Sequence, residues 1–185
     1  MLRLARKLLQ IASKSLNRLF SRCWLVPSHV SDDERIVRVI YSPYHLDKKK
    51  KRLTHYAYDP TPRTDDVSVM RLDHMGARLC KRKALSFENA GKKEYRGFAV
   101  LRVRTVRTSA MDVIDSRRHY CGHADIKFLI EELRTREPGE PLSAEVGKRF
   151  RDLKDSLLEA SNYLPDSQPR ASRWRGPKLE PPSGM

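Results

Sequence analysis

The sequence predicts an α+β fold, in which two to three helices cover a small, mostly antiparallel sheet or partial barrel. β-branched and other apolar residues concentrate in short runs, of which residues 36–42 and 97–106 are the clearest. Such runs are typical of strands. Apolar residues recur at helical spacing after Asp73 and after Ser143, which predicts amphipathic helices that cover the sheet.

The length of 185 residues predicts one domain, which we place at residues 32–164. A leader occupies residues 1–30, and a tail rich in proline, serine and arginine occupies residues 165–185. The composition of the tail predicts disorder, because few large apolar groups are available to compensate for the entropy of ordering. Trp174 is the exception, and it is either a short docking motif or a solvent-exposed residue without a role.

The charge balance favours an anionic partner. The chain holds 38 lysine and arginine residues against 23 acidic residues, a formal net charge of +15. Such an excess suits RNA, DNA, an anionic membrane surface or an acidic protein. A highly solvated surface is the alternative, and the sequence identifies no particular protein partner.

The cysteines and the hydropathy indicate the cellular compartment in which the protein is expected. The chain has three widely spaced cysteines, Cys23, Cys80 and Cys121. An odd number of distant cysteines argues against a disulfide scaffold and for a reducing compartment. No apolar run approaches the roughly 18 residues that cross a bilayer. We therefore expect a cytoplasmic protein, peripheral to a membrane if the leader binds one.

The leader has the pattern of a basic amphipathic helix. Its apolar side consists of Leu2, Ala5, Leu8, Leu9, Ala12, Leu16, Leu19, Phe20 and Cys23. Pro27 is expected to stop the helix. Three interpretations are open: residues 1–26 bind an anionic membrane surface, they form an organelle presequence, or they dock on the domain or on a protein partner.

A cationic hairpin is expected after the first strand. Residues 36–42 form that strand, and residues 53–58 are read as a short returning strand. The run between them consists of Lys48, Lys49, Lys50, Lys51 and Arg52. Tyrosines lie on either side of the run, and cations beside aromatic rings are the combination that binds single-stranded nucleic acid. A solvated loop tip is the alternative.

A second basic surface is expected on the helix that follows the strand at residues 67–71. Asp73 is expected to cap this helix, and its basic residues are predicted to lie mainly outside. They are Arg78, Lys81, Arg82 and Lys83.

The run at residues 97–106 is expected to be one strand with alternating faces. Ala99 and Leu101 would face one way, and Arg102 and Arg104 would make the end of the other face basic. That end is a candidate anion site, unless it is simply the solvated face of an antiparallel sheet.

Shorter elements complete the domain. Residues 113–114 and 121–128 are read as strands, the second followed by a turn of helix. Ser143 is expected to cap a closing helix at residues 144–163.

Two short motifs carry a resemblance. Val67-Ser68-Val69-Met70-Arg71 is followed some fifty residues later by His123-Ala124-Asp125-Ile126, which resembles a pattern in small bacterial proteins of unknown function. Many of those proteins have Asn-Pro shortly before the histidine, where this chain has Tyr120-Cys121-Gly122. The resemblance covers roughly residues 39–158, and it implies a small domain without implying an activity.

The sequence offers few groups for chemistry. Two histidines and a cysteine are spaced two residues apart, at His119, Cys121 and His123. A structural zinc site needs four ligands, and the groups that could complete one are distant in sequence. They are His55, His74, Cys80 and Asp115. We therefore predict no metal and no cofactor.

General acid–base cleavage of RNA would need His55 and His123 to move protons and Arg71 or Arg104 to stabilise charge. Cys121 beside His123 could also form a nucleophile pair. A buried, hydrogen-bonded His123 without a catalytic role is the alternative.

The sequence therefore predicts a non-enzymatic protein that binds RNA or DNA. The expected contacts are Lys48, Lys49, Lys50, Lys51, Arg52, Arg78, Lys81, Arg82, Lys83, Arg102 and Arg104. Two alternatives stay open. One is a small nuclease-like enzyme centred on Arg71 and His123, with His55 as a third candidate. The other is an adaptor anchored by the leader.

Overall fold

The structure is a computed structural model, and it describes residues 25–47, 49, 52–60, 65–88, 92–117, 119–135 and 140–182. The predicted leader helix lies almost entirely outside these residues. Lys48, Lys50 and Lys51 of the cationic run lie outside them as well. No described helix is long and apolar enough to cross a membrane.

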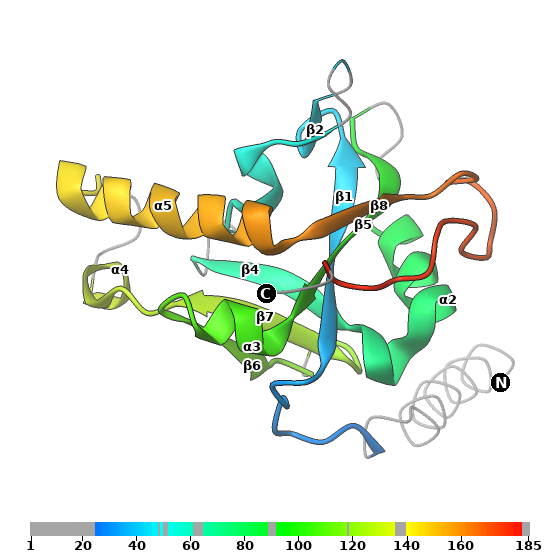
Figure 1. The fold of residues 1–185 in the computed structure, drawn as a ribbon, viewed down its shortest axis with the longest axis horizontal. Coiled ribbons are helices and arrows are strands. Elements are labelled where there is room, and N and C mark those ends of the chain that lie inside the picture. Colours follow the sequence, from blue (N-terminus) through cyan, green and yellow to red (C-terminus); the bar gives the residue numbers. More distant parts are fainter. Residues whose placement is uncertain are drawn as a thin grey trace, which may run out of the picture.

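An open six-stranded antiparallel sheet forms the centre of the molecule (Figure 1), with the strand order β6-β7-β4-β1-β5-β8. Its strands are β1 (Arg35–Ser42), β4 (Asp66–Arg71), β5 (Glu94–Arg102), β6 (Met111–Asp115), β7 (His123–Phe128) and β8 (Asn162–Pro165). A separate two-stranded hairpin joins β2 (Leu46–Asp47) to β3 (Arg52–Leu53). The predicted α+β class with a mostly antiparallel sheet is confirmed, and the sheet does not close into a barrel.

Each face of the sheet has its own hydrophobic core. The helices are α2 (Leu72–Leu85), α3 (Val103–Arg107), α4 (Glu131–Thr135) and α5 (Ala144–Ala160), with a 3-10 helix η2 (His55–Tyr58). Val146 and Leu157 of α5 pack on one face, which includes Ile36 of β1. Cys80 and Ala84 of α2 pack on the other. The period of two along the strands therefore divides the apolar residues between two layers.

The closing helix follows its sequence signals. Ser143 precedes α5, and its Oγ accepts a hydrogen bond of 3.3 Å from the backbone N–H of Val146. This bond satisfies one of the amides that the first turn leaves without a partner. The predicted cap is therefore confirmed, although the helix ends at Ala160 and gives way to β8.

The expected cap of α2 is wrong. Asp73 lies inside the helix, and its carboxylate accepts hydrogen bonds from the backbone N–H of Arg35 at 2.7 Å and from the Arg35 guanidinium at 2.9 Å. The carboxylate therefore fastens α2 to the start of β1. Gly76 has a φ of 69°, a left-handed conformation that suits glycine, and it introduces a kink into the helix.

The run at residues 97–106 does not form one strand. β5 ends at Arg102, and α3 begins at Val103. The amide of Val103 donates to the Glu34 carbonyl at 3.1 Å, and Val106, one helical turn later, is also buried. Burial of both valines on one helical face takes precedence over their strand propensity. The returning strand after the cationic run is likewise shorter than expected, because η2 replaces it from His55.

The prediction of a disordered tail is wrong for residues 166–182. This segment lies against α2 and the sheet, as the red end of the ribbon in Figure 1 shows. Leu179 is buried in the α2-side core, and the Trp174 ring lies 5.2 Å from that of Phe98. Burial of Leu179 and partial burial of Trp174 offset the low hydrophobicity of the rest of the segment.

Candidate functional site

The basic residues named by the sequence do not form one surface. Lys49 and Arg52 are exposed at the β2–β3 hairpin. Arg78 and Arg82 are exposed on α2, and Lys83 is half-buried there. These five side chains are at least partly accessible to solvent.

Lys81 is a correction to the predicted basic surface, because its side chain is fully buried. Its Nζ lies 2.7 Å from the Asp166 carboxylate and donates to the carbonyls of Gln168 and Arg173. The ammonium group is therefore used to hold the C-terminal segment, and it is closed to any outside ligand.

The predicted anion site at Arg102 and Arg104 is also not assembled. Because the strand ends at Arg102, the two residues belong to different elements. Arg104 forms an ion pair with Asp33, and Arg102 lies 3.4 Å from the Asp33 carbonyl. Both side chains are thus engaged with the loop before β1.

The side chain of Arg71 is buried and hydrogen-bonded within the protein. Its guanidinium is fully buried and donates to both oxygens of the Glu34 carboxylate, at 2.8 and 2.7 Å. It also donates to the carbonyls of Pro27 and His29 at 2.5 and 3.0 Å. The bidentate pair ties the segment before β1 to the end of β4. Arg71 is therefore held by contacts within the protein, and among the described residues no contact joins its side chain to that of His123.

The two predicted acid–base histidines lie in different parts of the fold. His55 begins η2, where it lines a hollow with Tyr56 and residues of α5. His123 begins β7, and its ring contacts His119 and Tyr120. A nuclease that used both histidines on one substrate is therefore not supported.

A cluster that the sequence analysis did not assemble lies where α2 ends. Lys83 Nζ lies 4.4 Å from the centroid of the Tyr120 ring and 4.7 Å from that of Phe87. Lys93 Nζ lies 4.1 Å from the centroid of Tyr41. The Tyr41 hydroxyl donates to the Ala84 carbonyl at 3.0 Å, which joins the two lysine–ring groups. We call Tyr41, Lys83, Phe87, Lys93 and Tyr120 the aromatic–lysine cluster.

The cations of this cluster lack acidic partners. Among the residues that the structure describes, no carboxylate lies within 4 Å of the ammonium groups of Lys83 and Lys93. Burial and the nearby Arg38 charge both lower the pKa of Lys93. Elsewhere, lysines such as Lys127 and Lys154 are paired with aspartates. The two ammonium groups of the cluster are therefore placed against aromatic rings and form no ion pair with a described carboxylate.

Arg38 adds to this charge from the sheet. β1 and β4 pair at only two positions, Ile36 with Arg71 and Val37 with Met70. Next along β1, the Arg38 guanidinium donates to the carbonyls of Ser68 and Ala57, at 2.8 and 2.9 Å. Both acceptors are neutral, so the charge of the guanidinium is solvated but not cancelled.

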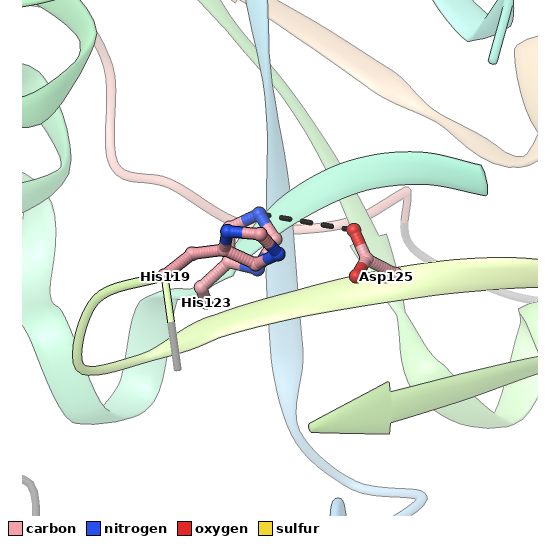
Figure 2. Close-up of side chains that lie close together, drawn as sticks. All are labelled: His119, His123 and Asp125. Carbon is pink, nitrogen blue, oxygen red and sulfur yellow. Dashed lines mark ion pairs between the residues drawn. The ribbon is translucent and has the colours of Figure 1, made fainter. Parts of the chain in front are cut away.

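A second group of polar side chains adjoins the cluster at the start of β7 (Figure 2). His119, His123 and Asp125 each place one nitrogen or oxygen atom within 4.8 Å of the others. His123 Nδ1 lies 2.6 Å from Ser116 Oγ, and its Nε2 lies 3.7 Å from Asp125 Oδ1. Burial lowers the pKa of His123, although the Asp125 carboxylate opposes this effect. His123 is therefore favoured in its neutral form.

The cysteines differ from one another. Cys80 is free and buried in the α2-side core. Cys121 is disulfide-bonded, which its spacing from the other cysteines did not lead us to expect. A disulfide sulfur carries no thiolate, so the hypothesis of a Cys121–His123 nucleophile pair is not supported.

No protein-family model matches this chain, and no curated protein or solved structure matches it either. The function is therefore inferred from the geometry and charge of the described residues.

Proposed function

We propose that this protein binds single-stranded nucleic acid, RNA or DNA, without catalysing a reaction on it, and that the aromatic–lysine cluster is the centre of the binding surface. The observation that carries the proposal is that Lys83 and Lys93 lie against aromatic rings and form no ion pair with any carboxylate in the described part of the chain. Phosphates would neutralise the two ammonium groups, and bases would stack on exposed ring faces.

The surroundings of the cluster support the same ligand. Phe87 is 46% exposed, so a large part of its ring is open to a base. Arg78 and Arg82 are exposed on the same helix as Lys83 and can continue a phosphate track along α2. Arg38 contributes positive potential from the sheet. Cation clusters without counter-charges raise the local concentration of polyanions.

A salt titration tests the proposal. Full-length protein is titrated with single-stranded RNA, single-stranded DNA, duplex DNA and anionic vesicles at several ionic strengths. We expect the single strands to bind more tightly than the duplex, with an affinity that falls steeply as salt rises, because counterions are released. An affinity that is flat between low and physiological salt, or binding to vesicles alone, would overturn the proposal.

A further inference from the structure

The geometry points to a metal site at the start of β7: we propose that His119, His123 and Asp125 bind one Zn²⁺ ion, with a fourth coordination position open to water. This site is independent of nucleic-acid binding. It also differs from the zinc ligands considered from sequence, because Asp125 takes the place of Cys121. The carboxylate comes from the next position on the same strand face as His123, two residues along β7.

The backbone brings the three groups together. The loop between β6 and β7 closes through bonds from Ser116 N to the His123 carbonyl and from His119 N to the Ser116 carbonyl, both 3.1 Å. A third bond runs from His123 N to the Tyr120 carbonyl, also at 3.1 Å. This loop folds His119 back over β7, so that its ring lies 5.0 Å from the ring of His123. Figure 2 shows the two imidazoles and the carboxylate converging.

Ser116 orients His123 as a ligand. When His123 Nδ1–H donates to Ser116 Oγ, 2.6 Å away, the neutral ring keeps its lone pair on Nε2. That nitrogen faces Asp125 at 3.7 Å. A hydrogen bond at the second ring nitrogen is the arrangement that metal-bound histidines almost always have. Ser116 is therefore a positioning residue for the site.

The distances suit a small ion after a minor adjustment. Zinc bonds of about 2.0–2.2 Å in a tetrahedron place donor atoms roughly 3.3 Å apart. The separation of 3.7 Å between His123 Nε2 and Asp125 Oδ1 is close to this value. His119 is exposed, so its ring can turn towards the other two groups. His123 and Asp125 are 5% and 9% exposed, so their donor atoms are largely shielded from solvent.

The donor set selects the metal. Two imidazoles and one carboxylate favour zinc and its neighbours over Mg²⁺ or Ca²⁺, which prefer oxygen ligands. Three protein ligands leave a position for water, as in zinc sites that are not purely structural. Among the described residues, His123 is the single basic side chain within 4 Å of the Asp125 carboxylate. The negative charge of Asp125 is thus available to a cation.

The test is a Zn²⁺ titration of full-length, tag-free protein after chelation and dialysis, with Co²⁺ as a spectroscopic probe. We expect one Zn²⁺ per chain and a Co²⁺ spectrum with the visible bands of a four- or five-coordinate ion. His119→Ala and Asp125→Asn should each weaken Zn²⁺ binding by at least tenfold. His119 is exposed, and Asn is close in shape to Asp, so both variants should fold.

Two further variants make the result specific. His55→Ala, which removes a histidine from a distant element, should bind Zn²⁺ like the parent. Ser116→Ala should weaken binding by about 10- to 100-fold, the usual effect of losing such a partner. The proposal is overturned if His119→Ala and Asp125→Asn retain the parent affinity, or if the Co²⁺ spectrum shows thiolate ligation. Failure of the parent to bind Zn²⁺ overturns it as well, whatever the result with nucleic acid.

Discussion

The ammonium group of Lys81 lies 2.7 Å from the carboxylate of Asp166, and both side chains have no exposed surface. Two further bonds from Lys81 Nζ, to the carbonyls of Gln168 and Arg173 at 2.8 and 2.9 Å, use the rest of its donors. A lysine in the middle of α2 therefore holds the segment that follows β8. The C-terminal residues belong to the folded domain because of this contact.

Lys81→Ala should destabilise the protein strongly. Removing one partner leaves the buried Asp166 carboxylate without its counter-charge, which typically costs about 3–5 kcal/mol. The free energy of unfolding is measured by denaturant titration, and limited proteolysis should show earlier cleavage after Pro165. Arg78→Ala, on the exposed side of the same helix, is the control and should change little. Equal stabilities for the two variants would contradict this account of Lys81.

Gly97 should not tolerate a side chain. It pairs with Pro165 between β5 and β8, and a Cβ atom at position 97 would lie 2.3 Å from the Leu164 carbonyl oxygen. Gly97→Ala should therefore separate the two strands and lower the melting temperature. Gly147→Ala is the matched control, because the nearest atom to its Cβ would be 3.7 Å away. In the interior of α5 this change should stabilise by about 0.5–1 kcal/mol, so a loss of stability there would contradict the helix assignment.

Stability should fall as the pH drops from about 6.5 to about 4, in part because of His45. Burial, followed by the charge of Arg38, lowers the pKa of His45 from 6.5 to about 4. In this pH window the unfolded chain binds a proton that the folded chain does not, so the unfolded state is favoured as the pH falls. The loss of stability over this window is about 3 kcal/mol. Unfolding free energies at several pH values measure it, and His45→Gln should flatten the profile relative to the parent.

Cys80 should be unreactive in the folded protein. Burial raises the pKa of its thiol to about 12, and the residue has no exposed surface. Only the thiolate is a good nucleophile, so a thiol reagent at pH 8 should modify Cys80 only after denaturant is added. The difference in the extent of modification between the parent and Cys80→Ala gives the contribution of Cys80. Rapid modification under native conditions would show that α2 opens readily.

Single-site charge changes locate the nucleic-acid surface. The logarithm of the binding constant falls linearly with the logarithm of the salt concentration. For a single strand, Lys83→Gln should reduce the magnitude of this slope by about 0.7, as expected when one phosphate contact is lost. Lys148→Gln makes the same charge change on the exposed side of α5 and should leave the slope unaltered. Tyr120→Leu should weaken binding by about 1–3 kcal/mol if a base stacks on the ring. Equal slopes for the two lysine variants would place the surface elsewhere.

Local signals in the sequence predicted much of the architecture. Strand periodicity located β1 and β4, and the Ser143 cap with its apolar stripe located α5. The core face predicted for Ala99 and Leu101 is confirmed, whereas the opposite face, with Phe98 and Val100, forms a second core that the sequence analysis did not predict. These features depend on residues a few positions apart, and so the local pattern is sufficient to predict them.

The candidate site depended on contacts between distant parts of the chain. Lys81 looks like any other cation of α2 until Asp166 is brought beside it. Similarly, Lys93 and Tyr41 form a lysine–ring pair only because β1 and β5 are neighbours. Asp125 was not among the metal ligands considered, because its closeness to His119 depends on how the β6–β7 loop folds.

Composition and pattern alone were thus enough for the fold class, the position of most strands and the excess of positive charge. The tertiary structure decided which charges are buried and which face solvent. The physical reason is that the energy of a charge depends on its solvation and on its counter-charge. Both are set by residues that meet only in the folded chain.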